Sequence, residues 1–184
     1  MKTSTSPQLV IALKASVSAA VIALTLSAPL AAHADPAKDL GVAGRALTFL
    51  ENGPTGRATL GVVFDPSKPA SVAEKNAIMA AIGGGYAAGA LTLVGKPVEA
   101  GDVAGVSGVQ ALFVTGGVNY GAVGGAAKAK KLITIGSDMA CVKSGACAMG
   151  VETEPKVSIT VNRATAAAVG AVFKAAFRMM ITEI

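Results

Sequence analysis

The sequence predicts an α/β domain, in which a mostly parallel sheet of about five or six strands carries an antiparallel hairpin at one edge and ends in a C-terminal helix. Two observations lead to this prediction. Short, wholly apolar runs bounded by turn residues alternate with segments of helical periodicity, which is typical of a parallel sheet in a three-layer arrangement. A later segment alternates apolar with polar residues, which indicates a half-buried strand of a hairpin.

The first elements follow from turn residues and apolar runs. Residues 35–53 fit one face of a helix, although two glycines weaken the pattern, and an Asn-Gly-Pro cluster ends the segment. Residues 59–64 (TLGVVF) form a continuous apolar run and predict a buried parallel strand. Ser71 and Glu74 have the spacing of a capping box, so we expect Ser71 to begin a helix that continues through Ile82.

Three further strands and a helix are predicted in the middle of the chain. Residues 91–94 form the first of these strands, with an extension to Val98 past a proline. The wholly apolar residues 111–114 form the second strand, and residues 132–135 form the third. A helix of small residues is expected between them, over residues 120–129.

The C-terminal part predicts a hairpin followed by a helix. Residues 149–152 and 156–161 are expected to pair, because apolar and polar residues alternate in the second segment. Asn162 is placed to cap the last helix. That helix is predicted to bury five side chains at helical spacing, namely Val169, Val172, Phe173, Ala176 and Met180.

Residues 1–34 have the pattern of a secretory signal peptide. The apolar run over residues 15–28 follows a basic segment and is shorter than the roughly 20 residues that span a bilayer. Residues 32–34 (AHA) supply the small-x-small site for signal peptidase. We expect cleavage, which leaves residues 35–184 as one periplasmic or secreted domain without a stable membrane span. An uncleaved membrane anchor is the alternative.

The composition of residues 35–184 argues against several classes of function. His33 is the only histidine and is lost with the signal peptide, so Ser-His and Cys-His catalysis are excluded. We expect a non-enzymatic protein with no catalytic residue, no cofactor and no metal site. Two of the 16 Lys and Arg residues precede the cleavage site, which leaves 14 against 11 acidic residues, scattered along the chain. This weak basic excess, with few aromatic residues, predicts no nucleic-acid binding.

Cys141 and Cys147 are the two cysteines of the sequence. In an oxidising compartment their spacing predicts a structural disulfide, which stabilises the fold by about 2 kcal/mol in the chain-entropy model. A redox dithiol or a metal site is the alternative, but the spacing is not C-x-x-C and the chain offers too few nitrogen and sulfur ligands for zinc.

A glycine-rich segment marks the candidate ligand site. Residues 116–121 follow a buried strand and open a helix, which is where α/β sheets bind ligands through backbone N–H groups. The segment matches no nucleotide-binding motif, and tight turns with close packing are the alternative explanation. The loop over residues 65–71 is expected at the same sheet edge. A small ligand would bind between the two loops, at Ser71, Thr115, Gly116, Gly117 and Asn119.

The C-terminal half resembles the YfiR family of periplasmic proteins. Residues 132–138 (LITIGSD) resemble that family's strand ending in a Gly/Ser-Asp turn, and a cysteine-bearing loop follows. Residues 159–162 (ITVN) resemble its Phe-Glu-Ile-Asn strand, and residues 164–170 start the terminal helix in the same relation. Residues 110–116 resemble its central apolar strand. The family's aromatic entry segment and its second cysteine pair are missing.

This resemblance implies a small α/β regulator that acts by protein-protein contact. In such proteins the domain is often dimeric and restrains an inner-membrane diguanylate cyclase by binding the cyclase's periplasmic part. We therefore expect an inner-membrane signalling protein and a second copy of the chain as partners. The alternative comes from residues 59–81, whose strand, Asp-Pro-Ser loop and helix are similar to one lobe of a periplasmic solute-binding protein. A single lobe would bind a small ligand.

Overall fold

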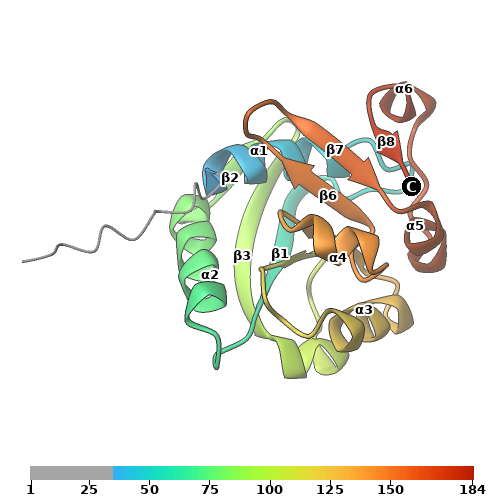
Figure 1. Ribbon diagram of the computed structural model, residues 1–184. Helices are drawn as coiled ribbons and strands as arrows, with labels where there is room; N and C mark the ends of the chain where they lie inside the picture. Colours follow the sequence, from blue (N-terminus) through green and yellow to red (C-terminus); the bar gives the residue numbers. More distant parts are fainter. Residues whose placement is uncertain (1–34) are drawn as a thin grey trace, which may run out of the picture. The chain divides into compact units, whose positions relative to one another are not determined.

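The computed structural model describes residues 35–184, so the predicted signal peptide and His33 lie outside the described residues. The described chain folds around an eight-stranded sheet with the order β2-β3-β1-β4-β5-β6-β7-β8 (Figure 1). Five strand pairs are parallel, and two pairs, β2–β3 and β6–β7, are antiparallel. The predicted α/β domain with a mostly parallel sheet is confirmed, with more strands than expected.

Strands and helices alternate over most of the chain, as the apolar runs predict. The strands are β1 (Gly56–Phe64), β2 (Tyr86–Ala88), β3 (Leu91–Glu99), β4 (Ala111–Val114), β5 (Ile133–Gly136), β6 (Met149–Glu152), β7 (Ser158–Val161) and β8 (Thr182–Glu183). The helices are α1 (Pro36–Leu47), α2 (Pro69–Ile82), the 3-10 helix η1 (Ala100–Gly105), α3 (Tyr120–Ala129), α4 (Met139–Lys143), α5 (Arg163–Val169) and α6 (Ala175–Arg178).

The strand order reverses at β1, which pairs in parallel with β3 on one side and β4 on the other. Val63 lies opposite both Val98 and Val114, so the three strands end close together. Beyond β4, the strands β5 and β6 continue the parallel part of the sheet. The reversal leaves a crevice position at the carboxyl ends of β1 and β4, where α/β sheets characteristically bind ligands.

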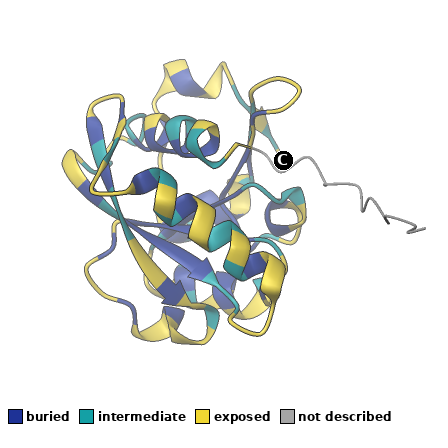
Figure 2. Ribbon diagram, turned by 90° about the vertical axis from the view of Figure 1, so that its left-hand side faces the viewer, coloured by how far each residue is buried: buried dark blue, intermediate teal, exposed yellow. Residues whose placement is uncertain are grey.

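Helices cover both faces of the sheet, because side chains of successive strand residues point to opposite sides. Val62 and Phe113 belong to one buried cluster, which α1 and α2 complete. Val63 and Leu112 belong to a second cluster, which includes residues of η1, α3 and α4. Buried residues concentrate in the strands and on the inward sides of the helices (Figure 2). The expected three-layer arrangement follows from these two clusters.

Two glycines explain why the helices approach the rest of the domain so closely. A Cβ atom on Gly44 of α1 would lie 2.3 Å from the Cβ atom of Ala88 in β2. A Cβ atom on Gly124 of α3 would lie 2.6 Å from the Cα atom of Ala146. Both distances are too short for real atoms, so these positions require glycine. The high content of small residues therefore serves close packing between elements.

The helix α2 begins earlier than the sequence indicated. Lys68 is the residue before its first turn and makes no side-chain capping bond, and Pro69 occupies the first helical position. A proline there has a backbone angle already suited to a helix and lacks an N–H group that would go unpaired. Ser71 lies inside the helix, so the prediction that Ser71 and Glu74 form a capping box is wrong. Both side chains bond to other elements instead.

The predicted single C-terminal helix is wrong. Asn162 caps α5 as expected, by accepting a hydrogen bond from the Thr165 backbone, but α5 ends at Gly170. Gly170 has a left-handed conformation (φ 76°), which is a common helix ending. Val172 and Met180, which were expected to be buried, are 53% and 64% exposed, and Ala176 is exposed as well. The remaining residues form α6 and the edge strand β8, so the β6–β7 hairpin does not lie at the edge of the sheet.

The segment after α5 contacts the end of α1 instead. Phe173 forms an isolated antiparallel bridge with Leu50, and backbone hydrogen bonds join Glu51 to Val172 and Lys174 to Phe49. Apolar packing strengthens this contact, because Phe177 stacks on both Phe49 and Phe173. The contact thus joins segments that lie more than a hundred positions apart in the sequence.

Within residues 35–184, no helix has the length and apolar character that crossing a membrane requires.

Candidate functional site

The loops after β1, β4 and β5 meet at the carboxyl edge of the sheet, beside the point where the strand order reverses. A hollow of about 280 Å³ lies there between the start of α2 and the loop after β4. Its lining comprises Lys68, Pro69, Ala70, Ser71, Glu74, Gly116 and Gly117. Two segments that were predicted to flank a ligand therefore lie next to each other.

Ser71, which lines the hollow, forms a buried hydroxyl pair with Thr115. Their oxygen atoms lie 2.6 Å apart, and neither residue is exposed to solvent. The Thr115 hydroxyl donates to the Val63 carbonyl at 2.9 Å, so its one proton is used and Ser71 must donate to Thr115. The Ser71 oxygen also accepts from the Asp65 backbone N–H at 2.9 Å. This pair ties the start of α2 to the ends of β1 and β4.

Glu74 reaches from α2 across the ends of two strands. One carboxylate oxygen, Oε2, accepts from the Gly116 backbone N–H at 2.8 Å. The other, Oε1, accepts from the Ser137 hydroxyl at 2.8 Å. Gly116 follows β4 and Ser137 follows β5, so both oxygens of one carboxylate are held by the loops of two neighbouring strands.

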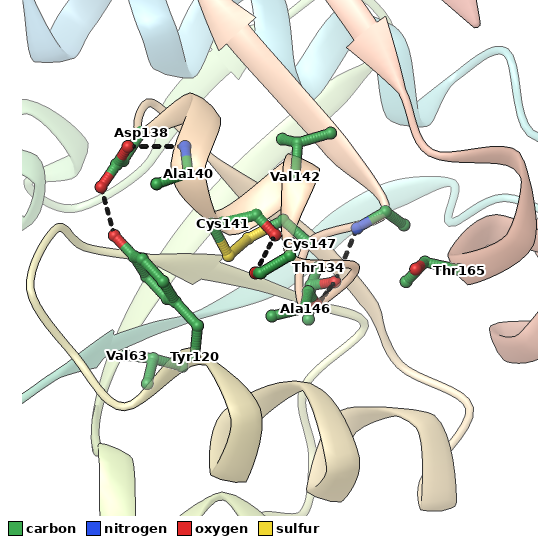
Figure 3. The surroundings of a disulfide bond; sticks show 12 residues. Val63, Tyr120, Thr134, Asp138, Ala140, Cys141, Val142, Ala146, Cys147 and Thr165 are labelled. Atoms are coloured by element: carbon green, nitrogen blue, oxygen red, sulfur yellow. Dashed lines mark hydrogen bonds between the residues drawn. A yellow bond between two sulfur atoms is a disulfide. The ribbon is translucent and has the colours of Figure 1, made fainter. Parts of the chain in front are cut away.

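Tyr120 and Asp138 form a second link between the segments that follow β4 and β5. The Tyr120 hydroxyl donates to Asp138 Oδ2 at 2.5 Å (Figure 3). It also accepts from the Gly117 backbone N–H at 3.3 Å. Burial raises the pKa of the Tyr120 hydroxyl far above its usual value, and the hydrogen bond to Asp138 adds to this effect. The tyrosine is therefore protonated at neutral pH and acts as a donor to Asp138.

Asp138 also links this edge to the disulfide. Its Oδ1 atom accepts from the Ala140 backbone N–H and caps α4, the helix that carries Cys141. The bond between Cys141 and Cys147 is present, as predicted from the sequence, and both cysteines are buried (Figure 3). The loop that it closes is held further by the Thr134 hydroxyl, which donates to the Ala146 carbonyl at 2.9 Å.

All five residues predicted to bind a ligand lie along the loop after β4 or opposite it on α2, but most of their polar groups have partners within the domain. The Asn119 side chain accepts from the Ala122 backbone N–H and caps α3. Ser71 and Thr115 bond to each other, the Gly116 N–H donates to Glu74, and the Gly117 N–H donates to Tyr120. Ligand binding at these five residues stays a prediction.

Sequence reasoning missed the side chains that organise this edge, which are Glu74, Ser137, Tyr120 and Asp138. Glu74 was assigned to a local cap, because Ser71 precedes it by three residues. The same spacing places both residues on one face of α2, which is a signal that the two share a neighbour. Ser137 and Asp138 directly follow a buried strand, and that position also indicates the carboxyl edge of a parallel sheet.

A larger and more open hollow lies beside this edge. It measures about 590 Å³, and the last residues of β3 line most of it together with residues in and after η1 and with Phe64 from the end of β1. Lys96 on its wall donates to the Ser107 carbonyl at 2.9 Å. Among residues 35–184, no group of three or more His, Cys, Asp or Glu side chains is placed to hold a metal ion.

Comparisons with known proteins identify the fold but no family. No family model matches the chain, and no curated protein matches it in sequence. The resemblance of the C-terminal half to the YfiR family therefore receives no support from these comparisons.

Solved structures with a similar fold include a substrate-binding protein. A conserved domain protein from Vibrio cholerae has a TM-score of 0.57 at 13% identity, over 82% of this chain and 60% of that one. A substrate-binding protein with adhesive properties from Clostridium difficile, in its ligand-free, open form, has a TM-score of 0.57 at 14% identity, over 80% and 58%. An ABC domain from Streptococcus pneumonia in complex with L-Trp has a TM-score of 0.56 at 13% identity, over 82% and 62%.

This chain thus spans about three fifths of the length of the structures that it matches. Its fold resembles a single lobe of ABC substrate-binding proteins. At identities of 13–14% the likeness extends to the fold alone.

Proposed function

We propose that this protein is a non-enzymatic, extracytoplasmic binding domain that takes a small polar ligand at the hollow between α2 and the loop after β4. The observation that carries the proposal is the position of this hollow. It lies at the carboxyl edge of a parallel sheet, beside the reversal of strand order between β1 and β4. Ligands of open α/β sheets bind at this place because loops from several strands converge there.

The size and lining of the hollow support a small, polar ligand. About 280 Å³ is near the lower end of the range for small-molecule sites, so a molecule of the size of an amino acid fits better than a nucleotide. Glu74 supplies a carboxylate on one wall, and Lys68 supplies a cation near the opening. Likeness in fold to a substrate-binding protein and to an ABC domain in complex with L-Trp points in the same direction.

A second copy of the chain would supply the face that one lobe lacks. The hollow is open to solvent, and a ligand bound there contacts protein on one side. A homodimer with two such edges facing each other would enclose the ligand and increase its buried area. We therefore include a homodimer in the proposal, and its formation is expected to depend on ligand.

The proposed location follows from covalent chemistry and the N-terminal sequence. The buried disulfide between Cys141 and Cys147 favours an oxidising compartment such as the periplasm. The signal-peptide pattern over residues 1–34 predicts export to that compartment. Both properties agree with the location of substrate-binding proteins outside the cytoplasm.

A thermal-shift screen with a matched pair of variants tests the proposal. A panel of amino acids, amines, sugars and inorganic anions is added to the purified protein, and a bound ligand raises Tm because it stabilises only the folded state. Ala70 is exposed and lines the hollow, whereas Ala80 is exposed on the same helix outside it. Ala70→Trp should abolish the response to any compound that raises Tm, and Ala80→Trp should retain it.

Two results would contradict the proposal. In one, no member of the panel raises the Tm of the folded protein. In the other, Ala70→Trp and Ala80→Trp respond alike, which would place the ligand elsewhere. Analytical ultracentrifugation with and without the active compound then tests the ligand-dependent dimer.

A regulator that contacts an inner-membrane signalling protein is the second candidate, and one observation favours it. Val172, Met179 and Met180 are large apolar residues that are 53%, 88% and 64% exposed. Exposed apolar side chains in one short segment favour contact with another protein. Recovery of a diguanylate cyclase from solubilised membranes by the wild-type protein, and not by a variant with these three residues changed to serine, would support this candidate over ligand binding.

A further inference from the structure

The Glu74 carboxylate, which lines the hollow, is held by donors from two separate loops. Its two oxygen atoms accept from one backbone N–H group and one hydroxyl group, each at 2.8 Å. The two donors come from the loops after β4 and β5 and converge on one point. Convergent uncharged donors of this kind are how proteins hold a carboxylate without a basic residue. The Glu74 carboxylate therefore occupies a place where two donors are positioned to bind a carboxylate.

We infer that the Gly116 N–H and the Ser137 hydroxyl form a carboxylate subsite, and that Glu74 fills it as a built-in occupant. This subsite rests on the proposed function for its biological meaning, because it implies that the hollow excludes a ligand carboxylate from these two donors. A free ligand cannot place its carboxylate on these two donors while Glu74 is bound. Glu74 is thus a specificity-determining residue of the hollow.

The helix makes Glu74 a strong competitor for the subsite. Ser71, one turn earlier on the same face of α2, is buried and bonded to Thr115, and Ile78, one turn later, is buried in the core. The backbone that carries Glu74 is therefore fixed on both sides of it. A tethered group competes at an effective concentration of millimolar or more. A free carboxylate in solution must exceed that concentration to displace it.

The surroundings show that the subsite would be open without the Glu74 side chain. Glu74 and Gly116 lie in the wall of the hollow of about 280 Å³, which Gly117 also lines, and Ser137 is held against this wall through Glu74 Oε1. A Cβ atom on Gly116 would meet Glu74 Oε2 at 3.5 Å and no other atom within 4 Å. A Cβ atom on Gly117 would meet nothing within that distance. We therefore expect that shortening residue 74 leaves the Gly116 N–H and the Ser137 hydroxyl without their partner at the edge of the hollow, where a small carboxylate can reach them from solvent.

Chemical rescue tests the inference directly. Glu74→Ala removes the occupant and leaves the donors. Acetate at about 100 mM should raise the Tm of this variant by about 3 °C, in a saturable manner, and sodium chloride at the same ionic strength should not. The wild-type protein should show no acetate response. Glu51→Ala, which removes an exposed glutamate outside the hollow, should behave as the wild type does.

A second variant keeps the test decisive if Glu74→Ala does not fold. The amide of Glu74→Gln has one acceptor oxygen for two donors, so it should hold the subsite less firmly. Its acetate response should lie between those of wild type and Glu74→Ala. In ¹H–¹⁵N spectra, the Gly116 amide signal should move with acetate in the variants and stay fixed in the wild type.

The inference is overturned if acetate stabilises wild type and variants equally, or if neither variant that folds responds to it. These outcomes are distinct from failure of the proposed function. If the solute panel leaves the wild type unchanged while Glu74→Ala gains a saturable acetate response, the subsite exists and the proposed ligand binding fails. If a solute raises the Tm of the wild type and Glu74→Ala gains no acetate response, the proposed ligand binding stands and the carboxylate subsite is refuted.

Discussion

The hydroxyl pair of Ser71 and Thr115 is a sensitive test of how the candidate site is built. Ser71→Ala removes two hydrogen bonds, one to Thr115 and one from the Asp65 backbone. Thr115→Val removes the bond from Ser71 and the bond to the Val63 carbonyl. At about 1 kcal/mol for each bond, each single variant should lower the free energy of unfolding by about 2 kcal/mol.

The double variant Ser71→Ala/Thr115→Val shows whether the two substitutions lower the free energy of unfolding independently or through their shared hydrogen bond. The Ser71–Thr115 bond is common to both single variants, so only three bonds are lost in the double variant. Its free energy of unfolding should fall by about 3 kcal/mol, which corresponds to a coupling of about 1 kcal/mol. Urea unfolding followed by circular dichroism measures all four proteins under one set of conditions.

Thr134 supplies the control for this double-mutant cycle. It is equally buried and its hydroxyl makes two hydrogen bonds, but it shares no hydrogen-bond partner with Ser71. The costs of Thr134→Val and Ser71→Ala should therefore add. If the Ser71–Thr115 pair is also additive, or if each single change costs less than about 0.5 kcal/mol, the buried network does not hold α2 as described here.

Three further predictions follow from packing, charge and the disulfide. Gly124→Ala should lower Tm, because its Cβ atom would lie 2.6 Å from the Ala146 Cα atom, whereas Gly125→Ala, in open space on the same helix, should raise stability by up to about 1 kcal/mol. Burial raises the pKa of Asp39, which the Thr153 hydroxyl partly offsets, so the folded state holds the Asp39 proton more tightly than the unfolded state does. Urea titrations should therefore show wild-type stability falling relative to Asp39→Asn as pH rises from about 4 through the folded-state pKa; parallel pH profiles would exclude this effect. Reduction of the disulfide should lower the free energy of unfolding by about 2 kcal/mol, and mass analysis after alkylation of the unreduced protein should detect no free thiol.

The elements that could be predicted from sequence have strong local signals. Residues 111–114 are wholly apolar and form β4 with the predicted bounds, because a strand buried on both faces leaves no place for a polar side chain. Asn162 precedes a helix and caps it, as predicted, whereas Asn119, which was predicted only to bind a ligand, also caps a helix. The two short strands at the sheet edges, β2 and β8, were missed because two or three residues carry no measurable periodicity.

The predictions that failed did so because tertiary contacts override a local pattern. Residues 169–180 have helical spacing, but Gly170 ends α5 and Phe173 pairs with Leu50 across the domain. For the candidate site, topology alone placed the loops after β1 and β4 at one edge, and the structure agrees. Which groups bond there depends on side-chain reach between loops, as Glu74 shows, and neither composition nor spacing contains that information.

The contact between residues 49–51 and 172–174 also has a consequence for how the chain folds. Residues 172–174 form hydrogen bonds with the turn after α1. In the sequence they follow seven of the eight strands, and only β8 comes after them. We expect contacts of such large sequence separation to form after the local ones, because the closure of a long loop is entropically costly. The end of α1 is therefore expected to become fully ordered only when residues 172–174 pack against it.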